Sequence, residues 1–257
     1  MTVQIAYRMI GAEILKLRRN RALMAFAGLL SVGAVVIFMG YLQLRHASNP
    51  TKYGPAGGTD GFIHLLKALG VFFGALAAIL IGAEAGTADQ SSGVFRDLVA
   101  TGRSRLALFF VRLGAAILVT LAFSAVAYGL GLLATFLFAG SNPTPSAGVV
   151  LQGAGWLVLA NSILAALAVG VGSVSGSRAV TLTAVIGLET VFTQLILNVS
   201  SLGAVRDLLP NAALGQLVPA GSGAGVTMTA GVATTVLVGW AVIPTVVGAW
   251  RTRTRDA

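Results

Sequence analysis

The sequence predicts an all-α membrane protein with six transmembrane helices in a single domain, residues 1–257. Composition is the first reason, because 56% of the residues are hydrophobic and 10% are charged, whereas soluble domains are about half apolar and about a quarter charged. The mean hydropathy is +0.88. Apolar runs are the second reason, because about 20 residues cross the hydrocarbon core as a helix. Such runs lie at residues 22–44, 62–85, 106–139, 147–174, 179–199 and 226–250.

The basic residues predict which side of the membrane the termini occupy. An even number of spans places both termini on one side, and the loops and ends of that side contain twelve Lys and Arg residues. The other side contains only Arg45, Lys52 and Arg206. Because positive charge marks the cytoplasmic side, we expect both termini in the cytoplasm and the chain in the cytoplasmic (inner) membrane. The first span is longer than a signal-peptide core of about 7–15 residues, so we expect it to be retained.

Residues 1–21 are predicted to form an amphipathic helix that lies in the membrane interface. At about 100° per residue its apolar side chains fall on one face. They are Val3, Ala6, Tyr7, Ile10, Ile14 and Leu17. The charged residues assigned to this interfacial helix are Arg8, Glu13, Lys16, Arg18 and Arg19. The alternative is a basic leader that directs topology and is helical without an interfacial role.

Small residues predict close helix packing. Three glycine pairs are spaced four residues apart, and each pair clears one helix face for close backbone approach. They are Gly70 and Gly74, Gly82 and Gly86, and Gly172 and Gly176. Two of the pairs fall in or beside the second span. We therefore expect span two to pack tightly against another helix, in the same subunit or in a second one.

A polar segment, residues 86–105, separates spans two and three. Within it, apolar residues recur at helical spacing, namely Val94, Phe95, Leu98 and Val99, and Gly102 ends the pattern. A short cytoplasmic helix with apolar side chains and nothing to cover them indicates a docking surface. A solvated loop is the alternative. The residues assigned to docking are Gln90, Val94, Phe95, Arg96, Asp97, Leu98, Arg103 and Arg105.

Charged residues inside the spans are candidates for function. Glu189 lies near the middle of span five, where an ionised side chain costs several kcal/mol unless it is paired or hydrated. With Gln194 and Asn198 it is predicted to line a substrate pathway, and the alternative is a protonated or hydrogen-bonded structural glutamate between helices. We expect Glu84 to pair with Arg96, Arg103 or Arg112. Asn161 is expected to form a hydrogen bond between helices.

Several functional classes are excluded or disfavoured. The net charge of +9 does not indicate nucleic-acid binding, because the basic residues flank apolar runs. The chain has no cysteine, which excludes disulfides and thiolate metal sites, and no metal site is predicted. No lysine follows a glycine, so there is no P-loop and the chain is not itself an ATPase. A membrane-embedded enzyme is disfavoured, because no Gly-x-Ser-x-Gly elbow is present and both histidines flank one external loop.

Four segments together resemble a type-2 ABC transporter permease, the membrane subunit of bacterial ATP-driven exporters. They are AEILKLRRNR before span one, GVFRDLVATGRSRLALFFVRL entering span three, LLPNAALGQLVP between spans five and six, and the tail WRTRTRD. The resemblance extends over nearly the whole chain and rests on the order of these parts. It implies that the first segment is an elbow helix, the second a coupling helix that contacts the nucleotide-binding subunit, and the third an external re-entrant segment.

The resemblance also implies partners. A separate nucleotide-binding ATPase subunit would bind ATP and Mg, so no cofactor is expected on this chain. A second permease, either another copy or a related chain, would complete the transporter. The implied substrates are drugs, antibiotic peptides, lipids or similar amphipathic molecules. The alternative function is an ATP-independent membrane channel or a scaffold protein, and dependence on an ATPase partner distinguishes it from a permease.

Overall fold

The computed structural model describes residues 3–91, 93–100, 102–220 and 228–254, which form helices and turns without a strand. Helix accounts for 86% of the structure. Six segments of the described chain are long and apolar enough to cross a membrane. They are Arg21–Ser48, Gly58–Gln90, Arg105–Leu137, Ala147–Ser175, Arg178–Asn198 and Ala230–Thr254. The prediction of an all-α, multi-pass membrane protein with six spans is therefore confirmed.

Three of the spans contain a π-helical turn, in which the backbone hydrogen bonds reach one residue further than in an α-helix. Span one consists of α2 (Arg21–Gly28), η1 (Leu29–Gly33) and α3 (Ala34–Ser48). Span two consists of α4 (Gly58–Lys67), η2 (Ala68–Phe72) and α5 (Phe73–Ser91). Span five consists of α9 (Arg178–Ile186), η3 (Gly187–Phe192) and α10 (Thr193–Asn198). The other described spans are the continuous helices α7 (Arg105–Leu137), α8 (Ala147–Ser175) and α12 (Ala230–Thr254).

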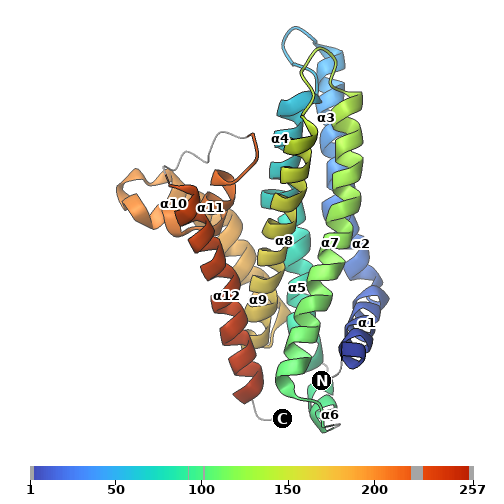
Figure 1. The fold of residues 1–257 in the computed structure, drawn as a ribbon, viewed down its shortest axis with the longest axis vertical. Coiled ribbons are helices and arrows are strands. Elements are labelled where there is room, and N and C mark those ends of the chain that lie inside the picture. The colour runs from blue at the N-terminus through green and yellow to red at the C-terminus, as the bar shows by residue number, and fades with distance from the viewer. Residues whose placement is uncertain (1–2, 92, 101, 221–227, 255–257) are drawn as a thin grey trace.

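Shorter elements connect the spans. Helix α1 (Val3–Arg19) precedes span one, and α6 (Val94–Ala100) lies between spans two and three. The 3₁₀ segment η4 (Ser200–Leu208) and helix α11 (Pro210–Gln216) lie between spans five and six. Figure 1 shows both termini and α6 at one end of the bundle, with the loops that follow α3 and α7 at the other end. This arrangement agrees with an even number of spans.

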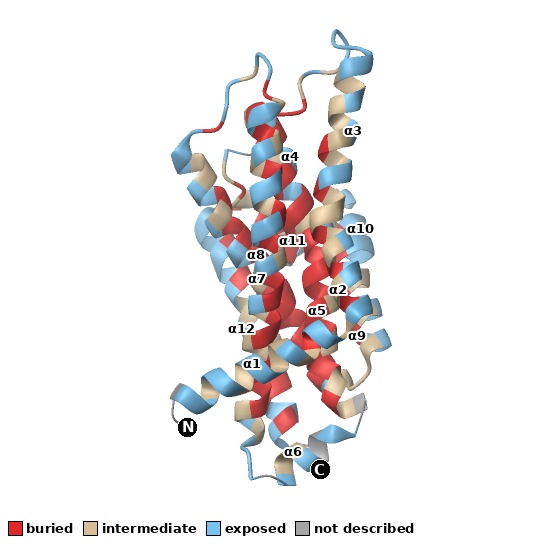
Figure 2. Ribbon diagram, turned by 90° about the vertical axis from the view of Figure 1, so that its right-hand side faces the viewer, coloured by how far each residue is buried: buried red, intermediate tan, exposed pale blue. Residues whose placement is uncertain are grey.

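Helices α5 and α8 pack along the centre of the bundle, where the buried residues gather (Figure 2). A Cβ atom added to Gly82 would lie 2.6 Å from the Ala165 carbonyl oxygen, and one added to Gly86 would lie 2.7 Å from the Val169 carbonyl oxygen. Backbones approach this closely only where side chains are absent. The predicted tight packing of span two is therefore confirmed, and its partner is α8 of the same chain.

Helix α12 contacts α8 in the same way. A Cβ atom on Gly170 of α8 would lie 2.3 Å from the Pro244 carbonyl oxygen, and one on Gly248 would lie 2.9 Å from the Gly170 Cα atom. Pro244 lies inside α12, at its closest approach to α8. Central α8 thus uses small residues on two faces, and this places α5 on one side of it and α12 on another.

The helix ends follow local sequence signals, and the largest difference from the expected boundaries is at the end of span two. Serine side chains cap the N-termini of α7, α8 and α9, namely Ser104, Ser146 and Ser177. Helix α5, however, continues to Ser91, past the predicted end of span two at residue 85. The small and polar residues at its end remain helical because they face neighbouring helices: Asp89 is paired, and Gln90 donates to the Ser173 carbonyl oxygen at 3.3 Å.

Helix α11 is buried against the core between spans five and six. Ala212, Ala213 and Leu214 pack in one apolar cluster with residues of α4 and α8. Two indole N–H groups anchor this segment, since Trp156 donates to the Leu214 carbonyl oxygen at 3.0 Å and Trp240 donates to the Leu208 carbonyl oxygen at 2.8 Å. The segment between spans five and six therefore packs into the bundle through α11.

Substitution of Gly82 by alanine should destabilise the protein, whereas the same change at Gly40 should not. The added methyl at Gly82 meets the α8 backbone at 2.6 Å, whereas no atom lies within 4 Å at Gly40. We expect Gly82→Ala to cost about 1–3 kcal/mol through overpacking, and Gly40→Ala to be neutral or to gain up to about 1 kcal/mol in helix propensity. Thermal unfolding of the two purified variants in one detergent measures this. Equal melting temperatures would contradict the packing described here.

Candidate functional site

Helix α6 is a short segment set off from the long helices at the end of the bundle where the termini lie (Figure 1). Two glycines in the left-handed region bound it, Gly93 with φ +74° and Gly102 with φ +78°, and other residue types rarely adopt such angles. On α6, Val94 and Asp97 are exposed and Leu98 is half-buried. The side chains of Phe95 and Arg96 lie outside the described residues. The predicted short helix is therefore present and presents an apolar and an acidic side chain to solvent.

The remaining residues assigned to docking contact other helices of the same chain. Gln90 belongs to α5 and donates to the Ser173 carbonyl oxygen of α8. The Arg103 Nη1 atom lies 3.4 Å from the Met9 sulfur of α1, and Arg105 donates to the Arg253 carbonyl oxygen of α12 at 3.3 Å. The predicted set is thus not one surface. Its flanking members connect the ends of α6 to three neighbouring helices.

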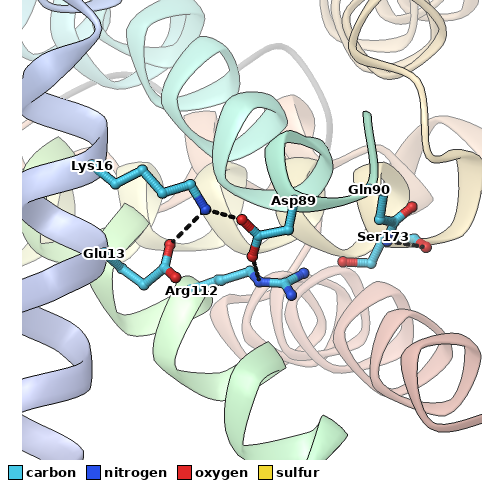
Figure 3. A network of polar contacts seen from close by, with 6 residues as sticks. All are labelled: Glu13, Lys16, Asp89, Gln90, Arg112 and Ser173. Atoms are coloured by element: carbon cyan, nitrogen blue, oxygen red, sulfur yellow. Dashed lines mark hydrogen bonds and ion pairs between the residues drawn. The ribbon is translucent and has the colours of Figure 1, made fainter. Parts of the chain in front are cut away.

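A buried ion-pair network lies at the end of α5 that precedes α6, and Figure 3 shows its members. Arg112 Nε of α7 lies 2.9 Å from Asp89 Oδ2 of α5, and the two side chains are only 1% and 2% exposed. Lys16 of α1 contacts the other Asp89 oxygen and lies 3.2 Å from Glu13. One carboxylate therefore joins α1, α5 and α7 at the end of the bundle that bears α6.

The N-terminal helix α1 contributes two of these residues and packs against α7. Ile10, Ile14 and Leu17 of the predicted apolar face contact the cluster that surrounds Phe109, whereas Tyr7 from the same face is 74% exposed. Glu13 and Lys16 join the network, while Arg8, Arg18 and Arg19 are exposed. The predicted amphipathic helix is therefore present, and residues 1–2 lie outside the described chain.

Glu84 makes a second ion pair at the same end, and its partner differs from the expected ones. Its Oε2 atom lies 2.8 Å from Arg178 Nη1 of α9, and its Oε1 atom accepts a hydrogen bond from the Asn20 amide at 3.0 Å. The prediction that Glu84 pairs with Arg96, Arg103 or Arg112 is wrong, because Arg112 faces Asp89 instead. Glu84 and Asp89 are five residues apart on α5, which directs them to different neighbours.

The residues assigned to the substrate pathway face different directions. Glu189 is 3% exposed and points into the protein, whereas Gln194 and Asn198 are exposed on α10. Asn198 donates to the Gln194 carbonyl oxygen at 2.8 Å. The backbone carbonyl of Glu189 accepts a hydrogen bond from the Asn211 amide at 3.0 Å, so Glu189 lies against α11. Glu189 and Gln194 are five residues apart, and five residues turn a helix by about 140°, so their side chains face different directions.

The opposite end of the bundle contains a cavity of about 400 Å³ between span one, span two and the loops that join the spans there. Its polar lining includes Arg45, Lys52, Tyr53, Asp60 and His64. The Arg45 guanidinium lies 4.0 Å from the centre of the Tyr53 ring. A hydrogen bond with Arg45 lowers the pKa of Tyr53. Both positive and negative side chains line this cavity, so its charge favours neither anionic nor cationic ligands.

Sequence reasoning missed the groups that make these contacts. Asp89, Arg178 and Asn211 were not singled out, although Arg112 inside span three already required an acidic partner. No local signal identifies Asn211, because its partner lies in another helix. The expected role of Asn161 is confirmed, since it donates to Ser124 of α7 at 2.9 Å.

Comparisons with known proteins do not place the chain in a family. No protein-family model matches it, and no curated protein matches it either. Among the described residues, no group of three or more His, Asp or Glu side chains is placed to bind a metal ion. The features that bear on function are therefore α6, the ion-pair network of Asp89 and the buried Glu189.

Replacing Asp89 by leucine should destabilise the protein more than replacing Arg112 by methionine. The first change removes the carboxylate that faces a buried guanidinium, while the second leaves Asp89 in contact with the partly exposed Lys16. Breaking a buried pair on one side costs about 3–5 kcal/mol, whereas exchanging both partners for apolar residues is often near neutral. The double variant should therefore recover most of the melting temperature lost by Asp89→Leu. Additive losses would show that the pair is not coupled.

Proposed function

We propose that the chain is the permease subunit of an ABC exporter, which forms the substrate pathway while a separate subunit hydrolyses ATP. The observation that supports this proposal most directly is α6, an exposed seven-residue helix bounded by two left-handed glycines. It lies at the end of the bundle that bears most of the positive charge, which is the cytoplasmic side by the positive-inside rule. Val94 and Asp97 give it both an apolar and a charged contact for a partner.

The position of α6 suits the transmission of force. It follows α5, the central helix that packs against α8, and precedes α7. The ion pair between Asp89 and Arg112 joins α5 to α7 at this point, and Lys16 adds α1. A push on α6 would therefore move three helices together instead of bending a loop. In our proposal α6 is the coupling helix and α1 the elbow helix.

The π-helical turns support a gating motion. We propose that closure of the ATPase dimer rocks spans one, two and five between inward-facing and outward-facing states. These are the three spans with a π-helical turn, whereas the other described spans are continuous helices. Such turns are local departures from α-helical hydrogen bonding that often lie at functional positions. Two permeases and two ATPase subunits, which bind ATP and Mg, would complete the transporter.

Substitution of Asp97 by arginine should detach the ATPase. Asp97 is exposed in the first turn of α6, and Asp60 is exposed in the first turn of α4 at the opposite end, so Asp60→Arg is a matched control. We expect a P-loop ATPase to co-purify in mild detergent with the wild type and the Asp60→Arg variant, and its yield to fall about tenfold or more with Asp97→Arg. Absence of any ATPase from all three samples would favour an independent channel or a scaffold.

Single-cysteine labelling tests the proposed orientation, because the natural chain has no cysteine. Asp97 and Lys52 are exposed and lie at opposite ends of the bundle. A membrane-impermeant maleimide should label Lys52→Cys in intact cells, and should label Asp97→Cys only after the cells are permeabilised. The reverse pattern would place α6 outside the cell and would be incompatible with a cytoplasmic ATPase.

A further inference from the structure

Glu189 is a buried carboxyl group near the middle of span five without a hydrogen-bond donor. Both of its carboxyl oxygens are covered, and neither has a hydrogen-bond partner among the described residues. The same is true of the Oδ1 atom of Asn211, whose amide nitrogen donates to the Glu189 backbone carbonyl at 3.0 Å. Three buried acceptor oxygens on two adjacent side chains therefore lack a donor. An unmet buried acceptor destabilises the folded protein, and more so if it is charged.

The described chain supplies no positive charge to this site. Neither α10 nor α11 contains a charged residue, and Arg178 of α9 is paired with Glu84 at the far end of its span. Segment η4 contains Arg206 and Asp207, and neither reaches the Glu189 oxygens, which have no donor. Acidic residues inside membranes are rare and usually pair with a cation or face a pathway. A donor that is not part of the described chain would satisfy the buried oxygens of this site.

A primary ammonium group matches this arrangement. It carries one positive charge and three N–H donors, and the buried oxygens of Glu189 and Asn211 are acceptors without a donor among the described residues. We propose that Glu189 and Asn211 bind the primary ammonium group of an amphipathic substrate. This inference rests on the proposed transport function and adds a substrate class to it. Charge-assisted hydrogen bonds are about twice as strong as neutral ones, so this site would favour an amine over an uncharged molecule of equal length.

Helix α11 covers the site, and its attachments indicate how binding could be observed. Asn211 belongs to α11, and Trp156 and Trp240 donate to the carbonyl oxygens of Leu214 and Leu208 on the same insertion. The insertion begins after Val199 and includes Gly203 with φ +48°, so its backbone departs from helical geometry at its start. A ligand that enters must displace this cover, which changes the environment of both indoles. Tryptophan emission therefore reports on the site.

The test uses the full chain in lipid nanodiscs, with Trp250 replaced by phenylalanine so that only Trp156 and Trp240 report. Three probes share one alkyl chain: dodecylamine, which is charged at neutral pH because amines of this type have a pKa of about 10, dodecyltrimethylammonium, which has the charge and no N–H donor, and dodecanol. We compare Glu189→Gln with Asp207→Asn, which removes a carboxylate of the same insertion outside the site.

Dodecylamine should change the emission saturably, at concentrations about tenfold or more below those of the other two probes. Glu189→Gln should weaken its effect about tenfold or more, and Asp207→Asn should leave it unchanged. The proposal is overturned if all three probes act alike, if Glu189→Gln responds as the wild type does, or if only sodium ions or acid change the emission. The comparison of probes on the wild type needs no variant, so a misfolded variant does not prevent a decision.

Co-purification of the ATPase separates this inference from the proposed function. If the ATPase binds and dodecylamine does not act through Glu189, the transport function survives and the amine site fails. If dodecylamine acts through Glu189 and no ATPase binds, the site survives and the ABC permease proposal fails.

Discussion

The close approach of α5 to α8 is the contact on which the rest of the structure depends. In a bilayer, burial of apolar side chains does not favour one helix neighbour over lipid, so helices associate through close packing and polar contacts. Gly82 and Gly86 allow the α5 backbone to contact α8 directly, and Gly170 gives α12 a similar contact on another face of α8. Polar side chains also attach α7 and α11 to these two helices.

The two ends of the bundle are fixed by different interactions. At the end with α6, Asp89 and Glu84 of α5 pair with arginines of α7 and α9, and Lys16 of α1 also contacts Asp89, so charged contacts join four helices there. Around α11, neutral hydrogen bonds from Trp156, Trp240 and Asn211 to backbone carbonyls attach the insertion. Neutral bonds contribute about 1 kcal/mol each, and buried ion pairs cost more to break. The polar contacts at the first end therefore cost more to break than those of the insertion.

This asymmetry fits a protein that receives force at one end and opens at the other. In the proposed mechanism this end transmits a displacement of α6 to the central helices, because Asp89 lies only two residues before the end of α5. In the same proposal, the insertion against Glu189 moves without unfolding the bundle. In the proposed gating motion, the π-helical turns of spans one, two and five are the local departures from α-helical hydrogen bonding at which these spans would change.

The sequence by itself determined the number of spans, the amphipathic helix α1, the short helix α6 and the tight packing of span two. These features depend on local signals: apolar length, helical spacing, and glycine where backbones approach or turn. Only the tertiary structure decided that α8 is the partner of span two and that Glu84 pairs with Arg178. It also decided that Glu189 is buried beside Asn211, whereas Gln194 is exposed. The physical reason is distance along the chain, because each of these contacts joins residues that many intervening positions separate, and their meeting depends on how whole helices pack.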